Sequence, residues 1–278
     1  MKKILVTTDF SVASKAGMRF AIQLASQMEV ELVFFNCFHA LIPSSIHQEH
    51  IKNSLHAQSQ DHLKKLEHFV SKLYRSMYVQ AGAHGCVVVE HLNPEQAILE
   101  YAHANGFQFI CMSTRGAGSI LKIIGTHTGN VLQRSSVPVM VIPHSYRVRP
   151  IQKVLYASDL ENFDSEMDIV SAFSDHLKVK TDLAHFYFPG KINLSREHLK
   201  QMWQQKYPQM DQLYLEQYNL DKGFPAQLDQ LIQKTRPSIV IFFSHAKKTW
   251  FDKIFGTSKA ASMSFVTKVP MLVYRKKQ

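Results

Sequence analysis

Short apolar runs alternate with longer amphipathic stretches along the first half of the chain. The runs are rich in Val, Ile, Leu and Phe, as buried strands are, and lie at residues 3–8, 30–38, 86–92, 107–112 and 138–143. The stretches between them carry apolar side chains at a spacing of three and four, which predicts helices within residues 11–28, 47–80, 93–105 and 127–135. Ser11 and Asn93 are placed to cap two of these helices. Strands that alternate with helices predict a parallel sheet covered by helices on both faces.

The second half follows the same plan. Its apolar runs predict strands at residues 153–158, 182–188, 237–244 and 270–275. Amphipathic spacing predicts helices at 195–205 and 224–235. Residues 207–224 are the least clear part of the pattern, and we place the third strand of this half at 212–223.

The similarity between the halves extends to individual segments. Residues 2–11 resemble residues 152–161, and each segment is an apolar run that ends in an aspartate, Asp9 or Asp159. A Val-Pro strand closes both halves, at residues 135–143 and 267–275. The chain is therefore interpreted as a tandem repeat. The polar stretch 144–150 gives the boundary, with domains at 1–146 and 151–278.

Composition and charge are those of a globular protein. Of 278 residues, 45% are hydrophobic and 19% charged, and no apolar run reaches the length of a membrane helix. The N-terminal run meets Asp9 too soon for a signal peptide, so we expect a cytoplasmic protein. The net charge of +10 is scattered, which indicates a solvated basic surface or a weak affinity for polyanions. Cys37, Cys86 and Cys111 lie in or beside apolar runs and are expected to be free thiols.

A loop rich in small residues follows the run at 107–112. Gly116 and Gly118 would let main-chain N–H groups approach a phosphate, and Gly125-Thr126 would begin the next helix. Asp9 would end the first strand at the same edge of the sheet and could accept from a ribose hydroxyl. The alternative is structural: the glycines only turn the chain, and Asp9 only caps a helix. The residues alone leave both interpretations open.

These segments resemble the universal stress protein family in its tandem two-domain form. The opening run through Asp9 resembles the family's first strand, and residues 113–143 resemble its signature of spaced glycines, a helix and a Val-Pro strand. The resemblance implies two open five-stranded parallel sheets flanked by helices, like the adenine-nucleotide alpha-hydrolases. Two departures concern the phosphate loop: Ser113 stands at the first glycine position, and only eight residues separate Gly116 from Gly125.

The resemblance also implies a site for ATP, or for AMP or ADP, with or without Mg. The nucleoside would meet two threonines, the aspartate and the chain near two later strand ends, at Thr7, Thr8, Asp9, Cys37 and Met112. The phosphates would meet the loop and the start of the next helix, at Ser113, Arg115, Gly116, Gly125, Thr126, His127 and Thr128.

The second half keeps the loop spacing but not its glycines. Ser244, Lys247 and Thr257 stand at the three glycine positions, and Gly256 is one place out of register. A Cβ at each close approach would hinder a phosphate, so we expect a degenerate second site. Asp159 would be present in a strand-end cap without any ligand, and Lys247 and Lys248 could still attract an anion.

No catalytic motif is evident, so at most slow ATP hydrolysis is expected. The first hypothesis is a nucleotide-responsive stress or regulatory protein, and the second is a scaffold of the same fold that binds no nucleotide. The apolar last strands of the two halves favour an internal pseudo-dimer, with homodimerisation of whole chains as a weaker expectation. No membrane or specific nucleic acid partner is expected.

Overall fold

The computed structural model divides the chain into two compact units. It describes residues 2–40, 48–114, 126–187, 196–244 and 268–276. The first unit runs to Val148 and the second begins at Arg149, apart from the loop outside the described residues. None of the described helices is long and apolar enough to cross a membrane.

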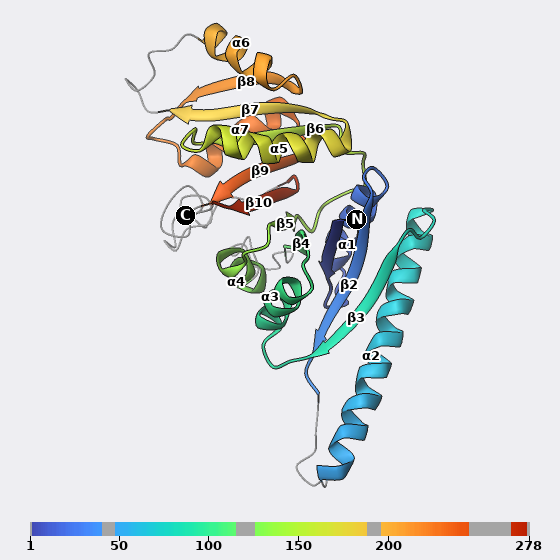
Figure 1. Ribbon diagram of the computed structural model, residues 1–278. Coiled ribbons are helices and arrows are strands. Elements are labelled where there is room, and N and C mark those ends of the chain that lie inside the picture. The colour runs from blue at the N-terminus through green and yellow to red at the C-terminus, as the bar shows by residue number, and fades with distance from the viewer. Residues whose placement is uncertain (1, 41–47, 115–125, 188–195, 245–267, 277–278) are drawn as a thin grey trace. The chain divides into compact units, whose positions relative to one another are not determined.

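The first unit is a five-stranded parallel sheet (Figure 1). Its strands are β1 (Lys2–Thr7), β2 (Val30–Phe38), β3 (His84–Glu90), β4 (Phe109–Ser113) and β5 (Val139–Ile142). The spatial order is β3-β2-β1-β4-β5. The order reverses between β1 and β4, so the carboxyl ends of these two strands form the switch point where open α/β sheets bind ligands.

Four helices cover this sheet. They are α1 (Ser14–Ala25), α2 (Gln48–Met77), α3 (Pro94–Ala104) and α4 (Thr126–Arg134). Helices α1 and α2 contact each other and the sheet, and α3 and α4 form a second contacting pair. The inner strands are buried on both faces, which explains their continuous apolar runs: Ile4, Leu5 and Val6 of β1 are fully buried, whereas the edge strand β3 is only partly buried.

The second unit has the same arrangement. Its strands are β6 (Lys153–Ser158), β7 (Lys180–Tyr187), β8 (Met210–Gln217), β9 (Ile239–Ser244) and β10 (Met271–Arg275), and their order is β8-β7-β6-β9-β10. All described pairings are parallel. The helices are α5 (Phe163–Leu177), α6 (Arg196–Lys206) and α7 (Phe224–Thr235).

The expected α/β architecture is confirmed, with three local differences. Helix α1 begins at Ser14 rather than near Ser11, although the Ser11 Oγ still accepts from the Ser14 N–H at 3.1 Å, as a cap would. Strand β8 begins at Met210, two residues before the predicted strand, and ends at Gln217. Helix α5 was not singled out in the sequence, because polar residues interrupt its buried positions Met167, Val170 and Phe173.

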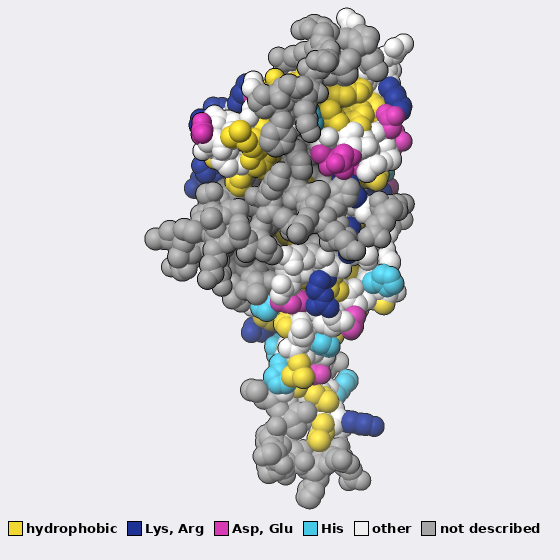
Figure 2. All heavy atoms as spheres, turned by 90° about the vertical axis from the view of Figure 1, so that its left-hand side faces the viewer, with side chains coloured by type: hydrophobic (Ala, Val, Ile, Leu, Met, Phe, Trp, Pro, Cys, Tyr) yellow, Lys and Arg dark blue, Asp and Glu magenta, His cyan; other side chains and the backbone are white. Residues whose placement is uncertain are grey.

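The distribution of charged side chains and the state of the cysteines agree with the expectations from the sequence. Basic and acidic side chains are interspersed on the face shown in Figure 2, which agrees with a solvated surface. All three cysteines are free, with Cys111 buried and Cys37 and Cys86 partly buried.

Candidate functional site

A tight turn after β1 presents Asp9 at the carboxyl edge of the first sheet. Phe10 has a φ of 64°, an uncommon value for a bulky residue. Its N–H donates to the Thr8 Oγ1 at 3.1 Å, and the Ser11 N–H donates to the Asp9 Oδ1 at 3.0 Å. These two bonds fix the turn and leave Asp9 exposed to solvent at the pocket described below.

Buried polar contacts hold this turn against its neighbours. The Thr8 and Ser14 hydroxyls lie 2.8 Å apart, so the turn is joined to the first turn of α1. The side-chain amide of Asn36 on β2 donates to the Thr8 carbonyl at 2.8 Å. Because Thr8 and Asn36 are both buried, these bonds satisfy groups that water does not reach.

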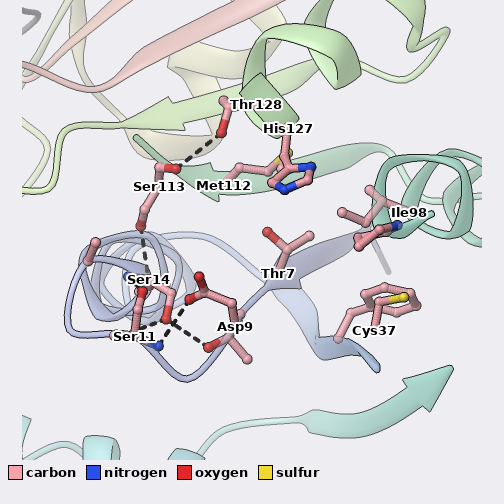
Figure 3. A pocket seen from close by; sticks show the side chains of 14 residues that line it. Thr7, Asp9, Ser11, Ser14, Cys37, Ile98, Met112, Ser113, His127 and Thr128 are labelled. Carbon is pink, nitrogen blue, oxygen red and sulfur yellow. Dashed lines mark hydrogen bonds between the residues drawn. The ribbon is translucent and has the colours of Figure 1, made fainter. Parts of the chain in front are cut away.

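The end of β4 is locked to α1 at the first glycine position of the family signature. The Ser113 Oγ accepts from the Gly17 N–H at 2.6 Å and donates to the Ser14 carbonyl at 3.2 Å. A Cβ on Gly17 would lie 2.8 Å from that Oγ. The absence of a side chain at Gly17 on α1 therefore leaves room for the Ser113 hydroxyl on β4. Figure 3 shows the bond from Ser113 toward Ser14.

The start of α4 is fixed from two sides. The Thr128 Oγ1 donates to the Ser113 carbonyl at 3.2 Å. The His127 Nδ1 lies 2.8 Å from the Glu95 Oε1, and the Asn130 amide donates to the Glu95 Oε2 at 2.9 Å. The Glu95 side chain is 11% exposed. A largely buried carboxylate on α3 thus engages two side chains of the first turns of α4.

These elements enclose a cavity of about 220 Å³ at the switch point. One side is polar and includes Asp9 and the hydroxyls of the turn, and the other is apolar and includes Phe35, Cys37 and Ile98. Burial, with a smaller contribution from Glu90, raises the pKa of the Cys37 thiol to about 11, so this thiol is uncharged at neutral pH. The full lining is Thr7, Thr8, Asp9, Ser11, Ala13, Ser14, Phe35, Cys37, Pro94, Ile98, Met112, Ser113, His127 and Thr128.

Eight of the residues named from the sequence line this one cavity. They come from four elements that are far apart in the chain, and are Thr7, Thr8, Asp9, Cys37, Met112, Ser113, His127 and Thr128. Arg115, Gly116 and Gly125 lie outside the described residues, and Thr126 is described only as the first residue of α4. Among the described residues, no group of three His, Cys, Asp or Glu side chains could hold a metal ion.

Sequence reasoning missed the α3 side of the pocket. Pro94 and Ile98 line the cavity, and Glu95 holds His127. Asn93 caps α3, since its side chain accepts from the Gln96 N–H at 3.1 Å as predicted. A helix that follows a parallel strand begins at the carboxyl edge of the sheet, where the site lies. The position of α3 directly after β3 could therefore have placed the first turn of α3 at the site.

The second unit repeats the turn but not the pocket chemistry. Leu160 has a φ of 66°, and its N–H donates to the Ser158 Oγ at 3.0 Å. The Glu161 N–H donates to the Asp159 Oδ1 at 3.1 Å, as Ser11 does to Asp9. The His185 Nδ1 lies 3.0 Å from the Ser158 carbonyl, where the first unit uses Asn36.

A lysine of the same unit forms an ion pair with Asp159, the carboxylate of this second turn. The Lys276 Nζ lies 2.7 and 2.6 Å from the two Asp159 oxygens and 3.1 Å from the Glu166 Oε1. Its side chain is 2% exposed, so this lysine is an exception to the solvated basic surface expected from the sequence. Glu166 also accepts a short hydrogen bond from the Tyr156 hydroxyl.

The charges of this cluster support one another. Burial alone would lower the pKa of Lys276, but its hydrogen bond and attraction to Asp159, together with Glu166, outweigh burial and raise that pKa. Burial, and then the bond to Glu166, raise the pKa of Tyr156. The cluster is therefore a buried lysine that contacts Asp159 and Glu166 closely and Glu161 at 3.7 Å, and Asp159 is the aspartate equivalent to Asp9.

Comparison with known proteins agrees with this architecture. A search of curated proteins finds no match. A universal stress protein from Archaeoglobus fulgidus DSM 4304 superposes with a TM-score of 0.70 at 16% identity, over 98% of each chain. A functionally unknown protein from Pseudomonas aeruginosa PAO1 gives 0.60 at 15% identity, over 99% of this chain and 92% of its own.

Matches to shorter proteins cover about half of the chain. A universal stress protein solved in complex with cAMP matches 51% of this chain and 96% of its own, at 18% identity and a TM-score of 0.36. The sequence pattern of the Universal stress protein family matches residues 1–143, which span the strands and helices of the first unit. With this match over half of its length, the chain belongs to the universal stress protein family.

Proposed function

We propose that the first unit binds one adenine nucleotide and that the chain acts as a nucleotide-responsive stress or regulatory protein. The observation that carries the proposal is the cavity at the switch point of the first sheet. It combines a carboxylate, several hydroxyls and an apolar wall, which is the combination that a nucleoside requires.

The two sides of the cavity suit the two parts of a nucleoside. Asp9 is a hydrogen-bond acceptor that suits ribose hydroxyls. Phe35, Cys37 and Ile98 form an apolar surface for the base. The start of α4 suits a phosphate, because the first N–H groups of a helix have no acceptor within the helix, and His127 and Thr128 lie there. In this proposal ATP is the first ligand, with AMP or ADP as close analogues.

The second unit supports a stoichiometry of one ligand per chain. Lys276 engages both oxygens of Asp159, so a ribose hydroxyl would have to displace a buried ammonium group. Displacement would take from the buried Lys276 the carboxylate that lies closest to it, which is costly. This closed site favours a scaffold or interaction role for the second unit.

Native mass spectrometry of the full chain in the presence of ATP tests the proposal. We expect one adenine nucleotide per chain, and none after Asp9→Ala. The matched control is Asp61→Ala, which removes an exposed carboxylate of α2 in the same unit and should leave the bound mass unchanged. Two nucleotides per chain would contradict the closed second site, and no nucleotide would favour the scaffold interpretation for the whole chain.

A further inference from the structure

His127 and Glu95 form a polar pair at the pocket. Neither the packing of the fold nor the apolar surface proposed for the base explains this pair. Helix α4 begins beside the pocket, and its imidazole projects into it (Figure 3). The His127 Nδ1 lies 2.8 Å from the Glu95 Oε1, whereas about half of the His127 side chain is exposed. Nδ1 thus faces Glu95, and the exposed part of the ring faces the pocket.

Glu95 is held firmly in place. It is 8% exposed as a residue, and its second oxygen accepts from the Asn130 amide at 2.9 Å. As an ionised carboxylate it can only accept hydrogen bonds, so the proton of a neutral His127 resides on Nδ1. Nε2 is then an acceptor when the ring is neutral and a donor when the ring is charged.

The two states of the ring suit two kinds of ligand. An acceptor at Nε2 repels phosphate oxygens, whereas an imidazolium donates to them with a charge-assisted bond. Histidine side chains change charge between about pH 5 and pH 8. We propose that His127, positioned by Glu95, makes the pocket discriminate between anionic and uncharged adenine nucleosides according to pH. This rests on the proposed function, since it assumes that a nucleoside occupies the cavity.

The other ionisable groups around His127 do not replace it in this role. Asp9, on the turn after β1, is a carboxylate and would oppose an anionic ligand. Cys37 on β2 keeps its proton, because burial raises the pKa of its thiol to about 11. The lining contributed by β4, Met112 and Ser113, does not titrate in this range. Among the described lining residues, His127 carries the one imidazole, the type of side chain that responds to pH in this range.

Calorimetric titration of the full chain with adenosine and with adenosine 5′-sulfate tests this inference. The sulfate keeps the same charge at about pH 6 and about pH 8, so a change in its binding reports the protein. In the natural chain we expect the preference for the sulfate over adenosine to be about tenfold greater at the lower pH, the size of one charge-assisted hydrogen bond.

Variants separate the contributions of the two residues. His127→Gln should remove the pH dependence of the preference, because a neutral amide cannot gain the charge. Glu95→Gln should weaken the preference at the lower pH by removing the anion that stabilises the imidazolium. Glu100→Gln, an exposed charge removal on the same helix, should behave as the natural chain. Thermal unfolding of each variant confirms that it is folded.

The outcomes distinguish this inference from the proposed function. Equal preference at both pH values in the natural chain, or a pH dependence that persists in His127→Gln, would overturn the inference while adenosine binding still supported the nucleotide site. Binding of neither ligand would overturn both. If Glu95→Gln fails to fold, the comparison of His127→Gln with the natural chain still decides the matter.

Discussion

Asp9 and Asp159 occupy the same place in two copies of one fold, and their surroundings differ in kind. Each follows the first strand of its sheet, and each accepts from the N–H two residues later, at 3.0 and 3.1 Å. Asp9 is exposed beside a cavity, whereas Asp159 is bound by the buried Lys276. A strand-end aspartate is therefore compatible either with an open pocket or with a cation supplied by the chain itself.

The residues around the two aspartates explain the difference. By the alignment of first strands, Val6 and Ala16 of the first unit correspond to Tyr156 and Glu166 of the second. Val6 and Ala16 are buried and apolar, so nothing at these positions would hold an ammonium group. In the second unit Tyr156 and Glu166 extend the polar cluster around Lys276. The closed site thus depends on several polar residues of the second unit that contact one another.

Removal of Lys276 should have the largest effect on stability. Lys276→Met leaves Asp159 and Glu166 without their buried cation, and we expect the second unit to lose about 3 to 5 kcal/mol of unfolding free energy. Both tryptophans, Trp203 and Trp250, lie in the second half, so their fluorescence during denaturation reports this unit.

The control for this change is Lys234→Met, which removes a lysine paired with Glu216 on the surface of the same unit. Its side chain is 64% exposed, and we expect a loss below about 1 kcal/mol. An equally small loss for Lys276→Met would show that the buried cluster does not stabilise the closed site.

A second change tests the packing that is specific to the open site. Gly17→Ala places a Cβ 2.8 Å from the Ser113 Oγ, and we expect a loss of about 1 to 3 kcal/mol in the first unit. The double variant Gly17→Ala with Ser113→Gly should recover part of this loss, because the crowded hydroxyl is gone. All three cysteines lie in the first unit, so thiol labelling during denaturation reports its unfolding. No recovery in the double variant would contradict the proposed exchange of glycine and serine.

Alkaline pH should destabilise the two units at different points. Burial raises the pKa of Cys37 and Cys86 from 9.0 to about 11, so the unfolded first unit releases these protons at lower pH than the folded one. Its stability is full below about pH 8.5 and falls as the pH rises through that range, by up to about 1.4 kcal/mol per pH unit for each group.

In the second unit the groups whose pKa is raised above an ordinary value near 10 include the buried Tyr156, Tyr274 and Lys276. Tyrosine and lysine have ordinary pKa values near 10, so the stability that these three groups contribute should be full below about pH 10 and fall above it. Denaturation at a series of pH values, followed by labelling and by fluorescence, measures the two onsets. A second unit that weakens first would contradict this order.

The smallest expected effect concerns the cap of α3. Asn93→Ala removes the bond to the Gln96 N–H and should cost the first unit about 1 kcal/mol. The corresponding helix of the second unit, α7, starts after Gly223 without a side-chain cap. Gly223→Ala should therefore be a milder change than Asn93→Ala, and thiol labelling and fluorescence compare the two. A larger loss of unfolding free energy in Gly223→Ala than in Asn93→Ala would contradict a stabilising role of the Asn93 cap.

The sequence predicted most of the fold because its main signals are local. Strands β2 and β6 and helix α7 match the predicted ranges to the residue, since buried parallel strands are continuous apolar runs and α7 has a regular apolar stripe. Helix α5 was not singled out because Asp164, Asp168 and Asp175 interrupt its pattern. The pairing of the units through their last strands stays a prediction.

The site was predictable only where a motif marked it. Asp9, His127 and Thr128 follow from the family pattern, and the structure places them around one cavity. Lys276 and Glu95 could not be identified in this way, because each is recognised only by its partner in space. Lys276 lies 117 residues from Asp159 and Glu95 lies 32 residues from His127, so tertiary packing alone brings these charges together.

The central claim is that the chain has one open site and one closed site, and calorimetric titration of the full chain with ATP tests it most directly. We predict one site per chain, loss of binding in Asp9→Ala and unchanged affinity in Asp159→Ala, provided that each variant is folded. Two equivalent sites, or binding that survives Asp9→Ala and disappears in Asp159→Ala, would contradict it.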